Sequence, residues 1–122
     1  KKFGAVNAWL SSEAAEVERY IYDPLCGYIF TNNGFLNLFK LQKSAFEVSG
    51  WSIGNTDLPI LLIAGADDPV IQGEKKFFQL KAFLKQVGYQ NISTKLYSNM
   101  RHELLNETGR QEVYRDILSF LE

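Results

Sequence analysis

The chain has 122 residues, of which 46% are hydrophobic and 22% charged, and its net charge is −1. This length and composition suit one globular domain and give no basic surface for nucleic acid. No apolar run approaches the ~20 residues of a membrane span. With one cysteine and one histidine, the sequence supplies neither a disulfide framework nor a zinc ligand set, so we expect no metal and no cofactor. No signal peptide is recognisable, which favours the cytoplasm.

The first fifty residues are expected to be helical and aromatic, with little strand signal. A first helix is predicted to begin after Ser11-Ser12, where either serine can cap it. It should end by Tyr22, because the chain then reaches an Asp-Pro pair and the residue before a proline is disfavoured in a helix. Residues 32–34, Asn-Asn-Gly, are expected to break the chain before a second amphipathic helix over residues 35–46.

Strands and helices alternate in the second part of the chain. Residues 60–65, Ile-Leu-Leu-Ile-Ala-Gly, form an uninterrupted apolar run, which predicts a strand buried on both faces. A helix is predicted over residues 74–87, with Gly88 as its C-cap. A second strand is predicted over residues 92–97, and a closing helix from about residue 108 to 121. This order predicts a parallel sheet.

Two polar side chains follow the two predicted strands. Asp68 lies in the loop after the first strand, and His102, the sole histidine, lies in the loop after the second. Because the carboxyl ends of parallel strands meet at one edge of a sheet, we expect these residues to converge there. A carboxylate that steadies an imidazole is the acid and base pair of a nucleophilic triad.

Both residues also have ordinary interpretations. A lone histidine is more often a surface or core residue, and an Asp-Asp-Pro sequence is more often only a turn. Their placement at successive strand ends favours catalysis. Of the two acids, Asp68 is the better candidate because it precedes Pro69, which keeps its backbone extended. Asp67 is interpreted as a solvated loop acid.

These residues carry a family resemblance over nearly the whole chain. Residues 65–70, Gly-Ala-Asp-Asp-Pro-Val, resemble the acid loop of α/β-hydrolases. Residues 101–103, with the helix around residues 113–117, are similar to the histidine loop and last helix of the monoacylglycerol lipase/lysophospholipase-like branch, also called serine aminopeptidase S33-like hydrolases. Residues 9–11 and 23–31 resemble the segment that ends the cap in bacterial members.

The resemblance implies an α/β fold, namely the C-terminal portion of an α/β-hydrolase with its last parallel strands and helices. Residues 1–50 would be a cap-derived helical segment that returns to the core, and residues 51–122 would carry the acid and histidine loops. Asp68 and His102 would be the triad acid and base, acting on a small ester or lipid such as an acyl glycerol or lysophospholipid. The candidate residues of the acyl pocket are Leu25, Tyr28, Phe30, Phe35 and Leu36, for which plain core packing is the alternative.

The family's nucleophile and oxyanion hole lie upstream of the cap. Ser52 does stand in a Gly-Trp-Ser-Ile-Gly sequence, but no buried strand precedes it and no helix can start after it, so we interpret it as a loop residue. The chain alone is therefore expected to be an inactive fragment that associates with the missing N-terminal half or with itself. The alternative is a non-catalytic binding or assembly module with the same fold.

Overall fold

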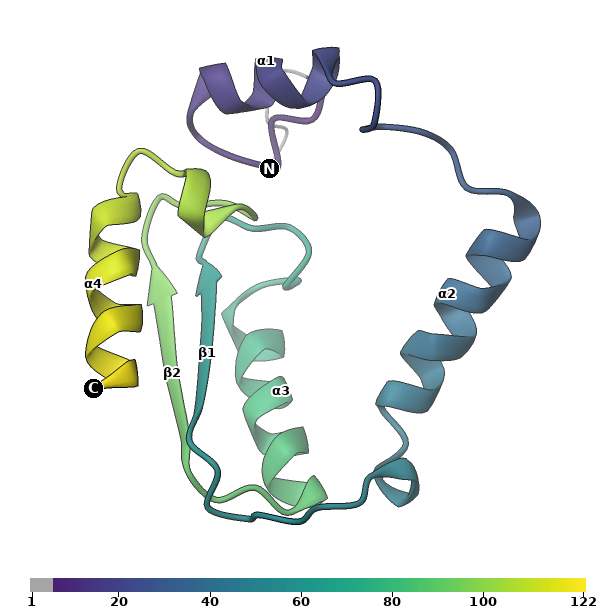
Figure 1. The fold of residues 1–122 in the computed structure, drawn as a ribbon, viewed down its shortest axis with the longest axis vertical. Coiled ribbons are helices and arrows are strands. Elements are labelled where there is room, and N and C mark those ends of the chain that lie inside the picture. Colours follow the sequence, from purple (N-terminus) through teal and green to yellow (C-terminus); the bar gives the residue numbers. More distant parts are fainter. Residues whose placement is uncertain (1–5) are drawn as a thin grey trace.

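The computed structural model describes residues 6–122 and contains a two-stranded parallel sheet (Figure 1). Strand β1 (Ile60–Gly65) pairs with β2 (Ile92–Tyr97) in a register that runs from Ile60 opposite Ile92 to Gly65 opposite Tyr97. Helix α3 (Glu74–Val87) joins the strands, and α4 (Arg110–Leu121) follows β2. Figure 1 shows the two strands running between α3 and α4.

The predictions for this part of the chain are confirmed. Both strands and α3 have the expected bounds, and the strands are parallel. Gly88 caps α3 with φ of 133°, a left-handed conformation that glycine adopts without a steric cost, and its N–H donates to the carbonyls of Leu84 and Lys85. One feature was missed: a short 3₁₀ helix, η2 (Leu104–Asn106), precedes α4, which therefore begins two residues later than expected.

The N-terminal helices begin differently from the prediction. Helix α1 (Ala14–Tyr22) ends at the expected residue, but its N-cap residue is Glu13, and the predicted serine cap is wrong. The side chain of Ser11 instead accepts a hydrogen bond from the N–H of Glu13 at 3.0 Å, so it orders the turn before the helix.

Helix α2 (Asn32–Ala45) includes the Asn-Asn-Gly sequence that was expected to break the chain. The reason is a cap: the hydroxyl of Thr31 accepts a hydrogen bond from the N–H of Gly34 at 3.1 Å. A second 3₁₀ helix, η1 (Val48–Gly50), follows α2.

The core lies between the sheet and α4. Tyr97, Met100, Leu104 and Val113 are buried together, with Ile63 and Ile117 packed against them. The prediction that β1 is buried on both faces is wrong for most of the strand, because only Ala64 and Gly65 of β1 are buried. The physical reason is that β2 is its only partner strand among residues 6–122, and α2, which buries none of its residues, lies away from the sheet (Figure 1).

None of the helices in the described part of the chain combines the length and the apolar character needed to cross a membrane.

Candidate active site

The loop after β1 is folded so that Asp68 is buried. The N–H of Asp68 donates to the carbonyl of Gly65 at 3.1 Å, which closes a tight turn directly after the strand. Oδ1 of Asp68 accepts the N–H of Val70 at 2.8 Å, so the side chain also orders the next residues. Its exposure is 6%, whereas the neighbouring Asp67 is half-buried. The loop thus gives one of its two acids a fixed position.

The loop after β2 brings His102 to this buried acid. Nδ1 of His102 lies 3.0 Å from Oδ2 of Asp68, a hydrogen-bonding distance. The side chain of His102 is 41% exposed, so the imidazole has a buried carboxylate at Nδ1 and remains accessible. This arrangement keeps the ring in one orientation and leaves Nε2 as the nitrogen that can exchange a proton.

Gly65 allows the two loops to approach each other. A Cβ atom at this position would lie 2.3 Å from both the Met100 and the Arg101 carbonyl oxygens, which belong to the histidine loop. The N–H groups of Ala66 and Asp67 donate to the carbonyls of Tyr97 and Met100 at 2.9 and 3.0 Å. These backbone contacts align the acid loop with the histidine loop. The sequence showed the glycine as the end of a strand but not its closeness to another loop.

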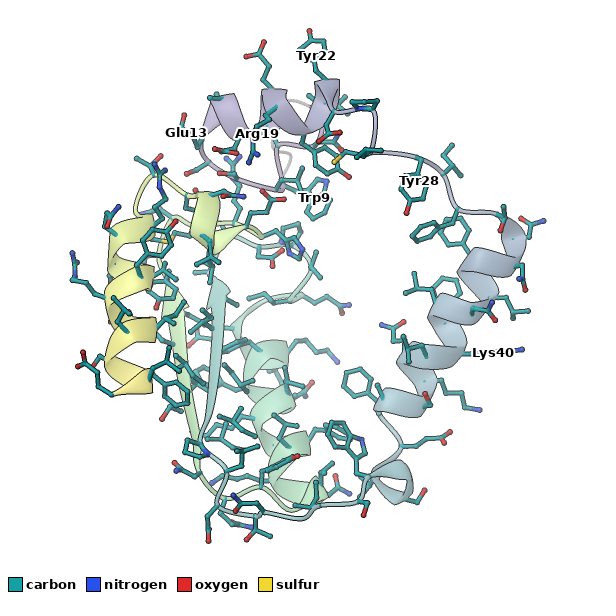
Figure 2. The ribbon with its side chains drawn as sticks, viewed as in Figure 1. Trp9, Glu13, Arg19, Tyr22, Tyr28 and Lys40 are labelled. Carbon is teal, nitrogen blue, oxygen red and sulfur yellow. The ribbon has the colours of Figure 1, made fainter. Side chains whose placement is uncertain are left out.

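A third segment, residues 7–12, lies against the histidine loop. The N–H of His102 donates to the carbonyl of Trp9 at 3.4 Å, and the N–H of Glu103 donates to that of Leu10 at 2.8 Å. The ring centroids of Trp9 and His102 are 5.1 Å apart, at an interplanar angle of 52°. Figure 2 shows Trp9 below α1, near the loops at the carboxyl ends of the strands. The sequence placed Trp9 only in a segment that resembles the end of the cap, because nothing in a single sequence shows which residue it will contact.

The comparisons with known proteins identify the family. The model of the family described as serine aminopeptidase, S33, matches residues 4–109. This chain belongs to that family. A crystal structure of a highly thermostable carboxyl esterase from Bacillus coagulans, in complex with glycerol, is 28% identical to this S33-family chain, with a TM-score of 0.71. The match covers 99% of this chain and 40% of the esterase. Comparison with curated protein sequences gave no match.

These findings establish the fold class. The chain has the architecture of the C-terminal portion of an α/β-hydrolase, in which parallel strands alternate with helices. It spans less than half the length of the esterase it resembles. In this S33-family chain, the two residues predicted to converge at the carboxyl edge of the sheet are in contact there.

The five candidate pocket residues lie elsewhere in the structure. Their exposures range from 40% to 81%. Three of them form an aromatic row at the start of α2, in which the ring centroid of Phe30 lies 5.4 Å from Tyr28 and 5.5 Å from Phe35. None of them lines the cavity of about 470 Å³ between the acid loop and α3, whose lining includes Phe46, Val70 and Phe83. The assignment of Leu25, Tyr28, Phe30, Phe35 and Leu36 to an acyl pocket stays a prediction.

Ser52 does not have the surroundings of a hydrolase nucleophile. It is exposed, it follows the 3₁₀ helix η1, and it lies in a connector without regular structure before β1. A nucleophile elbow needs a strand before the serine and a helix after it, and neither is present. Residues 6–122 also bring together no group of three or more potential metal ligands among histidine, cysteine, aspartate and glutamate.

Proposed function

We propose that Asp68 and His102 are the acid and base of a serine ester hydrolase, and that the serine nucleophile comes from a segment outside this chain. The observation that carries this proposal is the 3.0 Å contact between Nδ1 of His102 and a carboxylate that is buried. With Nδ1 engaged, Nε2 would take the proton of the serine hydroxyl and later give it to the leaving alcohol. Asp68 would stay ionised and stabilise the imidazolium.

The substrate class we propose is a small ester or lipid, such as a monoacylglycerol or a lysophospholipid. Membership of the S33 family and the likeness to a carboxyl esterase support ester hydrolysis. The five candidate pocket residues support an acyl pocket, because they are apolar and remain between 40% and 81% exposed in the described part of the chain. Residues 1–50 would then act as the cap-derived segment, and residues 51–122 as the part that carries the acid and histidine loops, in a cytoplasmic enzyme.

The chain alone is proposed to be inactive. The reaction also needs a nucleophile on an elbow and donors for the oxyanion, and loss of one such donor alone costs about 10²–10³ in rate. We propose that the partner supplying both is the N-terminal half of the hydrolase, which would pack against β1 and the apolar face of α2.

The test compares two adjacent acids in the full-length protein. Asp68→Asn should lower kcat for p-nitrophenyl butyrate by about 10⁴-fold, because it removes the charge that holds the correct histidine tautomer. His102→Ala should abolish labelling by a fluorophosphonate probe. Asp67→Asn is the matched control, since it makes the same chemical change at the neighbouring, less buried acid, and it should retain hydrolysis within a few-fold of the unmodified protein.

Retained hydrolysis in Asp68→Asn would overturn the assignment of the acid. A full-length protein that hydrolyses no ester and reacts with no fluorophosphonate would favour the alternative, a non-catalytic binding or assembly module.

A further inference from the structure

The carboxylate of Glu107 is the most buried charged group described in this chain, with an exposure of 0%. It follows η2 and precedes α4. Oε1 accepts the backbone N–H of Arg101 at 2.6 Å. Both oxygens accept the backbone N–H of Ser12, at 3.1 and 3.0 Å, and Oε2 also accepts the hydroxyl of Ser12. A carboxylate can be buried in this way because each oxygen receives hydrogen bonds that replace those of water.

The donors come from the two segments that surround the imidazole. Arg101 directly precedes His102 in the histidine loop. Ser12 ends the segment whose Trp9 ring packs against the His102 ring and whose carbonyls accept the His102 and Glu103 N–H groups. The guanidinium of Arg101 reinforces the same junction by donating to the carbonyl of Ser11 at 2.8 Å and to that of Ala8. Glu107 therefore links the backbone of the histidine loop to the backbone of residues 7–12, and both segments contact the imidazole of His102 or carry it.

We propose that Glu107 is a positioning residue for His102, because its buried carboxylate fixes the histidine loop against residues 7–12 and so holds the imidazole on Asp68. The carboxylate does not contact the ring and takes no part in proton transfer. This inference rests on the proposed function, in which His102 is the base. When Glu107 can no longer accept hydrogen bonds from both segments, we expect the imidazole of His102 to lose its fixed orientation.

Glutamine is the informative substitution at this position. Every group that points at the carboxylate is a donor: the two backbone N–H groups and the Ser12 hydroxyl. Glu107→Gln keeps the size of the side chain but turns one acceptor oxygen into an NH₂ group, which would then face an N–H. The histidine loop or residues 7–12 must then move away from the side chain. Unlike an alanine substitution, this change leaves no cavity.

The experiment uses the full-length protein uniformly labelled with ¹⁵N, with the His102 imidazole signals assigned by their loss in His102→Gln. In the unmodified protein we expect the tautomer protonated at Nδ1, with a downfield Nδ1–H proton typical of a hydrogen bond to a carboxylate. In Glu107→Gln this proton should broaden or disappear, and the amides of Arg101 and Ser12 should exchange faster with solvent. The value of kcat should fall by roughly 10- to 100-fold with little change in KM, as expected for a misplaced catalytic group.

Two control variants separate positioning from other effects. Glu112→Gln makes the same chemical change on the exposed face of α4, where the carboxylate pairs with Lys95, and should leave the His102 signals unchanged. Leu84→Ala removes a buried side chain of α3 and should lower stability without changing the imidazole tautomer.

An unchanged Nδ1–H signal in Glu107→Gln, or an equal change in Leu84→Ala, would overturn the inference. If Asp68→Asn left hydrolysis intact, the proposed function would fail, whereas the imidazole signals would still report whether Glu107 orients the ring.

Discussion

Gly65 is the residue at which the acid loop comes closest to the histidine loop. Any side chain there would meet two backbone carbonyl oxygens, of Met100 and Arg101, rather than flexible side-chain ends that could move aside. The constraint is steric and not conformational, because the position lies at the end of a strand. Asp68 and His102 belong to the two loops that such a side chain would separate.

Gly65→Ala is therefore expected to destabilise the protein by about 1–3 kcal/mol, the usual cost of inserting a methyl group into a packed site. Urea unfolding followed by circular dichroism gives the free-energy difference. Gly54→Ala is the matched control, because a Cβ atom there would meet nothing within 4 Å. It should be neutral or slightly stabilising, because alanine restricts the unfolded chain. Equal stability of the two variants would show that the loops can separate without cost.

At the scale of elements, β2 and α4 are joined by a polar network at the edge of the core. Nζ of Lys95 lies 2.5 Å from a carboxylate oxygen of Asp116 and 2.9 Å from one of Glu112. The hydroxyl of Tyr97 donates to the same oxygen of Asp116 at 2.7 Å. Burial, together with the hydrogen bond to Asp116, raises the pKa of Tyr97 to about 12, and the hydrogen bonds to Asp116 and Glu112 raise the pKa of Lys95.

These shifts predict a loss of stability at alkaline pH. Because the Tyr97 pKa is about 12 in the folded chain and 10.0 without the fold, the unfolded state releases the phenol proton first as the pH rises. Stability from this group is full below pH 10 and should be lost between about pH 10 and 12. The pKa of Lys95 is also raised in the folded chain, so its deprotonation should lower the stability further as the pH rises. Urea midpoints measured at pH 8, 10 and 11 should fall more steeply for the unmodified chain than for Tyr97→Phe.

Tyr22→Phe is the control for this experiment, because Tyr22 is exposed on α1, and its midpoints should follow those of the unmodified chain. A Tyr97→Phe variant with an unchanged pH dependence would show that the phenol does not contribute to it.

At the scale of the whole molecule, the chain leaves much of its apolar surface exposed. Helix α2 buries none of its residues, and Phe39 on this helix is 60% exposed. Both strands of the sheet also have an edge without a partner strand among residues 6–122. Unpaired edges and exposed apolar faces favour association.

We therefore expect the 122-residue chain to self-associate in the absence of a partner, with a sedimentation coefficient that rises with concentration. Phe39→Lys should reduce this association, since it places a charge in the apolar row of α2. Asn37→Lys adds the same charge to the same helix at an exposed polar position, and should change association less. A monomer at all concentrations in the unmodified chain would contradict the prediction.

The sequence predicted the elements best where the pattern was local. Strong apolar periodicity and Gly88 were enough for the bounds of α3, and the apolar run was enough for β1. The start of α2 was not predicted, because its cap depends on one hydroxyl of Thr31. At the candidate site, Asp68 and His102 could be inferred from strand order. Glu107 and the contact of Trp9 with His102 could not, because their partners are distant in sequence and local patterns carry no information about them.

The hydrogen bond between Ser12 and Glu107 joins positions 95 residues apart. Segments near the two ends of the described chain are therefore held together by a contact that does not depend on the backbone between them. If a protease cut the exposed connector between η1 and β1, the N-terminal piece would therefore still be bound to the C-terminal piece through the contact of Ser12 with Glu107. The nicked protein should run as two bands in a denaturing gel, whereas in solution the two pieces should stay together, with Trp9 still beside the imidazole. The connector is therefore a suitable site at which to divide the chain, so that the two pieces can be produced separately and then recombined.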